Sequence, residues 1–381
     1  MDRTEAIAWV LWICQGLLRK SQAKTLSVLV AASLTTVRLS LAGIGRELAS
    51  WHDAAAKHAI KRAWRFVVNR RIEPVELMPL LLNRLWRRKL AWHAAYPRRR
   101  PLLVSIDWTK IRRLHCLMAA VVVAGRGLPF CWQSYRDRVQ GKSQNVLEYA
   151  LLLRIKASLR PGVRLVILAD RGFGRAALIQ QCQRLGLDYL VRIAGDVIVR
   201  GERFRGNLQQ YPLTRGACQG WREVAYRSDA SVNTNLILRW KKGLPAKKDQ
   251  PWYLLTNLPL ERRGDARRYS DLYALRFDIE ELFRDGKNEH LGWSLAKTRI
   301  TRPDRLDRLI LILALAYLLL VALGLWCRQH CPPRTWASNN RPRELSAFAI
   351  GRVMLQRLRK RLRPLLDLLY ASLATPTPNW G

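Results

Sequence analysis

The sequence predicts an α/β protein with a helical N-terminal region and a β-rich insertion, and three observations support this prediction. The first hundred residues are rich in Ala, Leu and Arg and contain few strand signals. From residue 102 onward, short apolar runs alternate with amphipathic segments, which is the pattern of strands and helices packed in layers. Residues 196–262 then break this alternation with short strands separated by Gly, Pro, Asn and Lys.

The chain is long enough for two or three domains, and its charge indicates a polyanionic partner. Its 381 residues include 67 Lys and Arg against 28 Asp and Glu, which gives a net charge of +39. The hydrophobic content of 49% excludes a disordered chain. A charge of this size is typical of proteins that bind nucleic acid or an anionic membrane surface. The seven Cys residues have no paired spacing, so we expect reduced, mostly buried thiols in a cytoplasmic protein.

The N-terminal region is expected to be helical and to bind DNA. Leu39–Leu48 resembles the turn and second helix of a helix-turn-helix. Further on, Lys57, Lys61 and Arg65 recur every four residues and line one helix face, which suits contacts with phosphates. A solvated basic helix is the alternative interpretation. The stretch Pro97–Pro101, Pro-Arg-Arg-Arg-Pro, predicts a stiff linker that ends this region.

Five strands and two helices are predicted between residues 102 and 193. The strands are expected at 102–107, 115–123, 128–134, 164–170 and 188–193, and the helices at 143–159 and 175–185. Three meandering strands followed by right-handed crossovers give the sheet order 3-2-1-4-5. In this order the strand that ends at Asp107 lies beside the strand that ends at Asp170. Because neighbouring strands are ~4.8 Å apart, the two carboxylates can share cations, although a single Asp at a strand end is usually a turn former or a helix cap.

Tryptophans lie among lysines in the predicted β insertion. Trp221, Trp240 and Trp252 are in or beside its strands, and Lys241 follows the second of them. Aromatic rings among cations suit stacking on exposed bases. The alternative is that at least two of the three tryptophans fill the core of a small sheet.

The stretch 273–287 gathers one phenol, one carboxylate and three cations on a single predicted helix face. On a helical wheel, these side chains fall within about 80° of one another: Tyr273, Arg276, Glu280, Arg284 and Lys287. Such a face suits a metal held by the carboxylate and phosphate oxygens held by the cations and the phenol. A solvated face with Arg–Glu pairs is the alternative. The apolar positions form a separate stripe that is expected to face a core: Leu275, Ile279 and Leu282.

One apolar segment permits two interpretations. Leu309–Cys327 contains 19 consecutive residues without a charge, which is close to the length that spans a bilayer. A helix that is hydrophobic on all sides is also found at the buried centre of a large domain.

These residues together resemble bacterial insertion-sequence DDE transposases of the hairpin-forming group. Asp107 in Ser-Ile-Asp-Trp-Thr, Asp170 in Leu-Ala-Asp-Arg-Gly and Glu280 resemble the Asp-Asp-Glu triad of these enzymes. The stretch 273–287 matches their Tyr-x2-Arg-x3-Glu-x6-Lys signature position for position. Trp252-Tyr-Leu-Leu-Thr256 matches the strand whose first residue, a Trp, stacks on a flipped base in the family. The resemblance covers roughly residues 30 to 325 and favours a buried helix over a membrane span.

The resemblance implies a domain organisation. Together with the sequence pattern, it implies a helical DNA-binding region at 1–100, an RNase H-like catalytic domain at 101–195 plus 263–330 and a β-rich insertion at 196–262. The resemblance does not extend to residues 331–381, where the charge and the spacing of Leu residues predict a basic helical C-terminal tail.

It also implies a chemistry: cut-and-paste DNA transposition by nicking, hairpin formation, hairpin opening and strand transfer. Asp107, Asp170 and Glu280 would bind two Mg²⁺ or Mn²⁺ ions. Tyr273, Arg276 and Lys287 would hold phosphates of the transposon end, and Trp252 would stack on the flipped base.

The implied partners are double-stranded DNA with terminal inverted repeats, target DNA and a second copy of the chain, without a membrane, in a cytoplasmic, nucleoid-associated protein. A metal-dependent nuclease on the same fold and a non-catalytic DNA-binding regulator are the alternatives, and an integral membrane protein is a more remote one.

Overall fold

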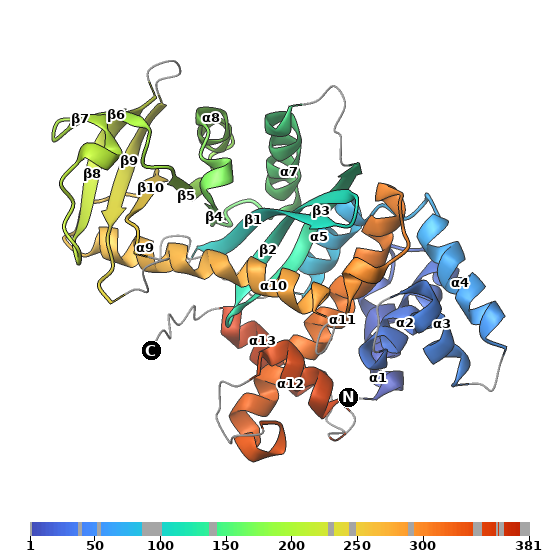
Figure 1. Cartoon of the computed structure of the whole chain (residues 1–381). Helices are drawn as coiled ribbons and strands as arrows, with labels where there is room; N and C mark the ends of the chain where they lie inside the picture. Colours follow the sequence, from blue (N-terminus) through green and yellow to red (C-terminus); the bar gives the residue numbers. More distant parts are fainter. Residues whose placement is uncertain are drawn as a thin grey trace. The chain divides into compact units, whose positions relative to one another are not determined.

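A computed structural model describes residues 2–36, 40–51, 55–85, 101–136, 143–227, 232–243, 249–288, 293–337, 345–355, 357 and 362–373 (Figure 1). The chain divides into two compact units, and each is made of segments that are distant in the sequence. Unit 1 contains Met1–Leu90, Trp108–Gln140 and Asp278–Thr375, and unit 2 contains Ala91–Asp107, Gly141–Phe277 and Pro376–Gly381. Of the linker predicted at Pro97–Pro101, only Pro101 lies within the described residues.

The described residues of the N-terminal part of unit 1 form the helices α1 (Arg3–Cys14), α2 (Lys20–Thr35), α3 (Leu41–Ala49), α4 (Ala56–Val68) and α5 (Pro74–Leu85). A capping box of Asp2 and Glu5 begins α1, and the side chain of Ser40 caps α3 by accepting from the N–H of Gly43. Helices α3 and α4 cross closely at Gly45, where an added Cβ would lie 2.6 Å from Ile60. The helical character predicted for this region is confirmed over the described residues.

The long apolar helix α11 (Pro303–His330) is the core of unit 1. It is long and apolar enough to cross a membrane, but 94% of its most apolar 18-residue stretch is buried inside the protein. Around it pack α2, α4, α5, β3 (Arg126–Arg136), α12 (Ala347–Met354) and α13 (Leu362–Leu373). The side chain of Arg308 is also buried, and it donates to the carbonyls of Val67 and Ile72 at 3.1 and 2.8 Å. These contacts support the interpretation of this segment as a buried central helix.

The strands hydrogen-bond in the order β3-β2-β1-β4-β5-β10-β9-β8-β6-β7. The first five are β1 (Leu102–Ile111), β2 (Leu114–Val123), β3, β4 (Leu165–Ala169) and β5 (Asp188–Ile193). Their order confirms the predicted 3-2-1-4-5. The helices α7 (Gln144–Ser158) and α8 (Ala176–Arg184) connect β3 to β4 and β4 to β5. Strand β1 begins in unit 2 and ends in unit 1.

The β-rich insertion continues the sheet of unit 2. Its strands are β6 (Ile198–Arg200), β7 (Arg205–Asn207), β8 (Cys218–Tyr226), β9 (Val232–Arg239) and β10 (Trp252–Thr256). Strand β10 pairs antiparallel with both β5 and β9. The start of β10 therefore lies at the same edge as the end of β5, a placement that the sequence pattern did not predict.

The single helix predicted over 273–287 is wrong, because a 3-10 turn interrupts it. Helix α9 (Asp265–Ala274) is followed by η4 (Leu275–Phe277) and then by α10 (Asp278–Lys287). A 3-10 turn advances about 120° per residue against about 100° in an α-helix, so its three residues rotate everything that follows by about 60° from the predicted wheel. The predicted apolar stripe is nevertheless buried: Leu275, Ile279 and Leu282.

A buried carboxyl in α11 is expected to make stability depend on pH. The carboxylate of Asp307 accepts a hydrogen bond from the backbone N–H of Ser134 at 2.9 Å. Burial raises the pKa of Asp307 to about 7, although the hydrogen bonds from Ser134 oppose this. The folded protein therefore holds this proton more tightly than the unfolded chain, and stability falls as pH rises from about 4 to about 7. We expect Asp307→Asn to stabilise the protein at pH 8 by on the order of 3 kcal/mol and to have little effect near pH 4, as measured by denaturation at both pH values.

A matched control lies one turn away at Asp304, which pairs with Arg308 at 3.0 Å. Burial acts to raise the pKa of Asp304, but the hydrogen bonds from Arg308 and Arg302 outweigh it and the pKa is lowered. Asp304→Asn should therefore destabilise the protein at pH 8. If Asp307→Asn also destabilised it at pH 8, the Asp307 carboxyl would be a paired anion and not a neutral acid.

Candidate active site

Two carboxylates and a guanidinium lie in one row across three neighbouring strands of unit 2. The register of the parallel pair β1–β4 runs to Ser105 opposite Leu168, and two residues further on it places Asp107 opposite Asp170. The same continuation of the β4–β5 register places Asp170 opposite Arg192. Residues directly opposite one another share a face of the sheet, on strands ~4.8 Å apart. The structure thus brings the two predicted aspartates together, but Asp107 does not end its strand as predicted. Strand β1 continues to Ile111, whereas Asp170 directly follows the last residue of β4.

The turn that carries Asp170 is anchored by the ion pair between Arg175 and Glu148. Asp170 caps η1 (Arg171–Phe173), and its Oδ1 accepts from the N–H of Gly172 at 2.8 Å. Arg175 donates to the carbonyl of Gly172, to Asn145 Oδ1 at 2.6 Å and to the Glu148 carboxylate. Glu148 lies in α7 and is only 1% exposed. The position of Asp170 therefore depends on an ion pair whose carboxylate is buried and whose guanidinium is partly exposed.

Tyr273 and Arg276 face these aspartates from α9 and η4. Arg276 is 4% exposed, and its Nη1 lies 3.5 Å from Asp107 Oδ2. Burial raises the pKa of Tyr273 to about 12, although the charges of Arg276 and Arg192 oppose this. The phenol is therefore protonated at neutral pH and can act as a hydrogen-bond donor.

Cations surround the partly exposed ring of Trp252. The Lys241 Nζ lies 5.0 Å and the Arg192 Cζ lies 5.9 Å from the ring centroid. Tyr273 packs against the indole edge to face, with centroids 5.3 Å apart and planes at 78°. Of the other two tryptophans, Trp221 is a core residue at 3% exposure, whereas Trp240 is partly exposed. One tryptophan of the three, not two, is thus fully buried.

Three further predicted site residues lie on α10 in unit 1. Glu280 is exposed to solvent. Arg284 is exposed as well and pairs with Glu281 at 2.7 Å, as expected for a solvated helix face. Lys287 is partly buried, and its Nζ donates to Thr109 Oγ1 at 2.7 Å. The structure does not gather Tyr273, Arg276, Glu280 and Lys287 on one helix face.

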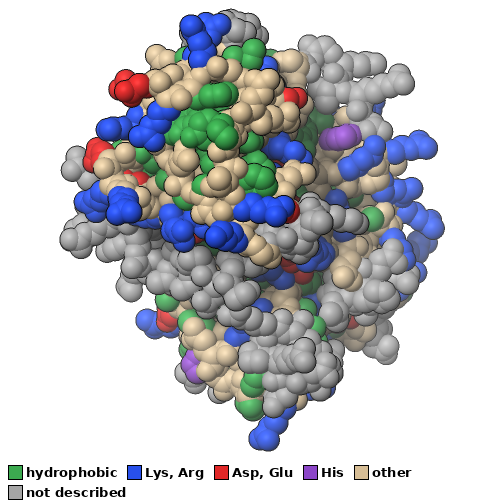
Figure 2. All heavy atoms as spheres, turned by 60° about the vertical axis from the view of Figure 1, so that its left-hand side comes forward, with side chains coloured by type: hydrophobic (Ala, Val, Ile, Leu, Met, Phe, Trp, Pro, Cys, Tyr) green, Lys and Arg blue, Asp and Glu red, His purple; other side chains and the backbone are tan. Residues whose placement is uncertain are grey.

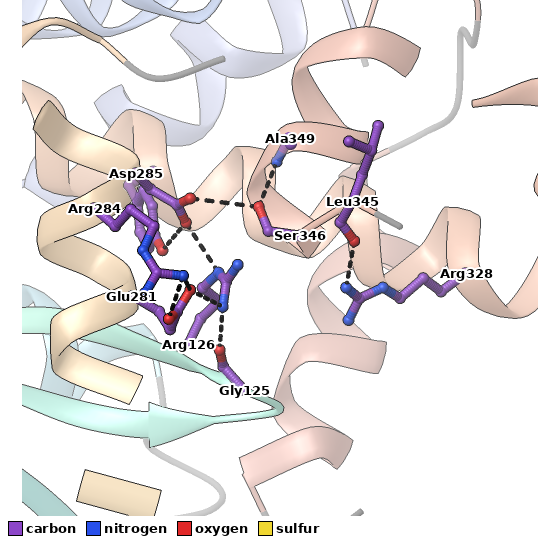
Figure 3. A network of polar contacts seen from close by, with 10 residues as sticks. Gly125, Arg126, Glu281, Arg284, Asp285, Arg328, Leu345, Ser346 and Ala349 are labelled. Atoms are coloured by element: carbon purple, nitrogen blue, oxygen red, sulfur yellow. Dashed lines mark hydrogen bonds and ion pairs between the residues drawn. The ribbon is translucent and has the colours of Figure 1, made fainter. Parts of the chain in front are cut away.

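The buried side of α10 is fixed by Arg126, which also reaches Glu281 at the edge of the exposed face (Figure 3). Its guanidinium lies 2.9 Å from Asp285 Oδ2 and 3.4 Å from Glu281 Oε2. Asp285 also accepts from the hydroxyl of Tyr317 at 2.8 Å and from that of Ser346 at 3.4 Å. This buried network resists rotation of α10 and thereby keeps Glu280 on the solvent side.

Helix α4 presents an unbroken basic face in unit 1. The predicted Lys57, Lys61 and Arg65 are all exposed. Beside them Trp64 is 42% exposed, with the Arg305 Cζ 4.6 Å from its ring centroid. On the face of the molecule drawn in Figure 2, Lys and Arg side chains far outnumber Asp and Glu.

Comparison with known proteins identifies the family. Residues 98–319, more than half of the chain, match the family described as the transposase DDE domain. The chain belongs to the DDE transposase family. It is therefore an enzyme that acts on DNA in transposition and DNA recombination. Its mixed α/β architecture fits an RNase H-like core.

Two further comparisons add little. Among curated proteins, no sequence matches this transposase significantly. A cryo-EM structure of a piggyBac transposase synaptic complex with hairpin DNA is similar at 11% identity and a TM-score of 0.43, covering 98% of this chain and 77% of that chain. A likeness this weak does not bear on the function of the present transposase.

The residues of unit 2 fit the metal that the family requires. DDE transposase domains are metal-dependent. Among the described residues, no group of three or more His, Cys, Asp and Glu side chains is arranged to hold a metal. Asp107 and Asp170, opposite one another on adjacent strands, nevertheless present the carboxylate oxygens that Mg²⁺ and Mn²⁺ prefer.

Arg192 is a site residue that the sequence pattern did not single out. It lies within the strand predicted at 188–193, and counting the register of that strand against the one ending at Asp170 would have found it. Lys241 was already noted beside the tryptophans of the insertion, but Arg239 had no such signal, because its place opposite Trp252 depends on how β9 pairs with β10.

Removing Glu148 is expected to loosen the turn that carries Asp170. Glu148→Ala removes the carboxylate that pairs with Arg175, whose side chain is 27% exposed and can still reach water, so we expect a loss of about 1–3 kcal/mol of folding stability. Chemical denaturation measures this loss, and Glu202→Ala, at an exposed position of the same unit, should change stability by no more than about 0.5 kcal/mol. Equal, small effects of the two changes would show that the ion pair does not anchor the turn.

Proposed function

We propose that this transposase excises a DNA element through hairpin intermediates and inserts it into target DNA. The observation that carries the proposal is the row of Asp107 and Asp170 beside Tyr273, Arg276 and Trp252 in unit 2. Carboxylates supply metal ligands, the phenol and guanidinium supply donors to phosphate, and the indole supplies a surface for one unpaired base.

Three acidic residues are assigned as metal ligands. Asp107, Asp170 and Glu280 would hold two Mg²⁺ or Mn²⁺ ions, which supply charge that activates the nucleophile and stabilises the leaving oxygen. The exposed position of Glu280 on α10, four residues after Arg276, supports its inclusion. The neighbouring Glu281 is engaged by Arg126 and Arg284 and is a poorer candidate.

The residues around these acids are assigned to the DNA end. Tyr273, protonated at neutral pH, donates a hydrogen bond to a phosphate oxygen, and Arg276 neutralises charge on the phosphate under attack. Lys287 and Arg284 on α10 hold further phosphates. Trp252 stacks on a base displaced near the transposon end, which offsets the cost of unstacking it.

The chemistry is a sequence of phosphoryl transfers. Water attacks a phosphodiester at the element end and leaves a 3′-OH. That hydroxyl attacks the opposite strand, which closes a hairpin and releases the flanking DNA. A second water opens the hairpin, and the renewed 3′-OH attacks target DNA. Each step breaks one phosphodiester, and the leaving oxygen takes up the proton that the attacking oxygen loses.

The helical N-terminal region is proposed to bind the terminal inverted repeats. Lys61 and Arg65, exposed on α4 together with Lys57, form a basic face that suits the phosphate backbone. Two copies of the chain, each holding one element end, would make the synaptic complex.

Removal of any one metal ligand should abolish chemistry and leave DNA binding intact. Asp107→Ala, Asp170→Ala and Glu280→Ala each remove a carboxylate without removing a cation. We expect affinity for end DNA at or slightly above that of the parent and no detectable cleavage in Mg²⁺. Near-parental cleavage by one of the three would remove that residue from the site, and Glu281→Ala would then be tested in its place.

The hairpin step is tested with purified protein, Mg²⁺ and DNA that carries the inverted repeats flanking the element. A denaturing gel should show hairpin-ended fragments, whereas a plain nuclease would give only nicks and breaks. Trp252→Ala should leave the first nick intact and slow hairpin formation by about 5- to 150-fold, the equivalent of ~1–3 kcal/mol of lost stacking.

Trp240→Ala is the matched control, because this partly exposed indole bonds to Asp249 and lies at the end of the adjacent strand. Trp240→Ala should not slow hairpin formation more than it slows the first nick. Equal slowing of nicking and hairpin formation by Trp252→Ala would mean that Trp252 is a packing residue.

A further inference from the structure

Three cations gather around Trp252, and nearby carboxylates balance their charge only in part. Arg192, Arg239 and Lys241, called here the Trp252 cation cluster, come from β5, from the end of β9 and from the residues after it. Arg239 is directly opposite Trp252 in the β9–β10 pair, so the two side chains share a face of the sheet. Within the described residues, none of the three cations makes an ion pair with Asp or Glu.

The hydrogen-bonding capacity of the cluster is partly unused. Buried side-chain atoms without a hydrogen-bond partner among the described residues include Nε and Nη1 of Arg239 and Nε of Arg192. Buried donors of this kind are uncommon in native proteins and call for a partner. Because all three atoms belong to guanidinium groups, an anion that accepts hydrogen bonds is the ligand that suits them best.

The charges in the cluster repel one another. Burial lowers the pKa of Lys241 and the charge of Arg239 lowers it further, while Asp271 opposes both. Burial likewise lowers the pKa of Arg192, and Arg171 and Arg276 add to this, while Tyr273 and Asp170 oppose it. A folded protein keeps like charges together at a cost, which an anionic ligand removes.

We propose that Arg239 and Lys241 bind a backbone phosphate of an unpaired DNA nucleotide whose base stacks on Trp252. The ligand class is a phosphodiester in single-stranded DNA at the element end, and the assignment to that end rests on the proposed function. The indole holds the base, and the two cations hold the phosphate next to it. Proteins that bind single strands commonly combine aromatic stacking on bases with cations that contact the backbone. The β insertion thereby acts as a nucleotide-binding surface that continues the catalytic sheet.

Binding measurements without cleavage test the inference. Two probes carry the same inverted repeat: one is a blunt duplex, and the other ends in two unpaired nucleotides. Affinity is measured in EDTA between about 50 and 200 mM salt. Arg239→Gln should weaken binding of the unpaired-end probe by about 5- to 50-fold at low salt and reduce the slope of log affinity against log salt by about 1. Binding of the blunt probe should not change.

Lys241→Gln should act in the same direction, and it carries the test by itself if Arg239→Gln fails to fold. Arg222→Gln, at an exposed position on β8 of the same unit, is the matched control and should leave both probes unaffected. In a Trp252→Ala background, Arg239→Gln should weaken binding of the unpaired-end probe less than it does in the parent protein, because Trp252 and Arg239 hold the same nucleotide.

The proposal would be overturned if Arg239→Gln and Lys241→Gln both kept the parental slope of log affinity against log salt on the unpaired-end probe. Equal losses of affinity on the two probes would overturn it as well. A parent protein that forms no hairpins in the cleavage assay, but shows the selective slope change, would refute the hairpin pathway and leave this phosphate site standing.

Discussion

The parallel register of β1, β4 and β5 is the constraint on which the candidate site depends. Continued past Ser105–Leu168 and Ala169–Val191, it places Asp107, Asp170 and Arg192 in one row, within β1 and at the carboxyl ends of β4 and β5, on strands ~4.8 Å apart. A shift of one residue in either pair would turn one of these side chains to the opposite face. Buried apolar side chains along all three strands oppose such a shift, since every position of β4 is buried. The core of the sheet thus fixes the geometry of its polar edge.

Charge balance at this edge divides into two zones. Around Asp107 and Asp170 the charges are mixed, and Arg276 neutralises one carboxylate. Around Trp252 they are mainly positive, with Asp271 acting on Lys241 and Asp170 acting on Arg192. Metal ions suit the first zone and phosphates suit the second, so a DNA strand running along the edge would meet complementary charge at each point.

Helix α10 is fixed by different forces from the segment that precedes it. Tyr273 and Arg276 are buried against unit 2 side chains, whereas α10 is held by Arg126 and the carboxylates that surround it in unit 1. The 3-10 turn between them lets each part satisfy its own contacts. In one continuous helix, the angular positions of Tyr273 and Arg276 would be fixed relative to those of the α10 side chains. The two groups of side chains could then not both reach their contacts.

Much of this architecture follows from local pattern. Alternating apolar runs, chain order and crossover handedness were enough to predict the sheet order 3-2-1-4-5 and the meeting of Asp107 with Asp170, because these rules act on short segments. The residue spacing also identified the stretch 273–287. Tertiary packing alone decided the break at Leu275–Phe277, the burial of Trp221 but not Trp252, and the arrival of Arg239 beside Trp252. Each of these depends on which distant segment supplies the neighbouring surface, and no periodicity in the sequence encodes that choice.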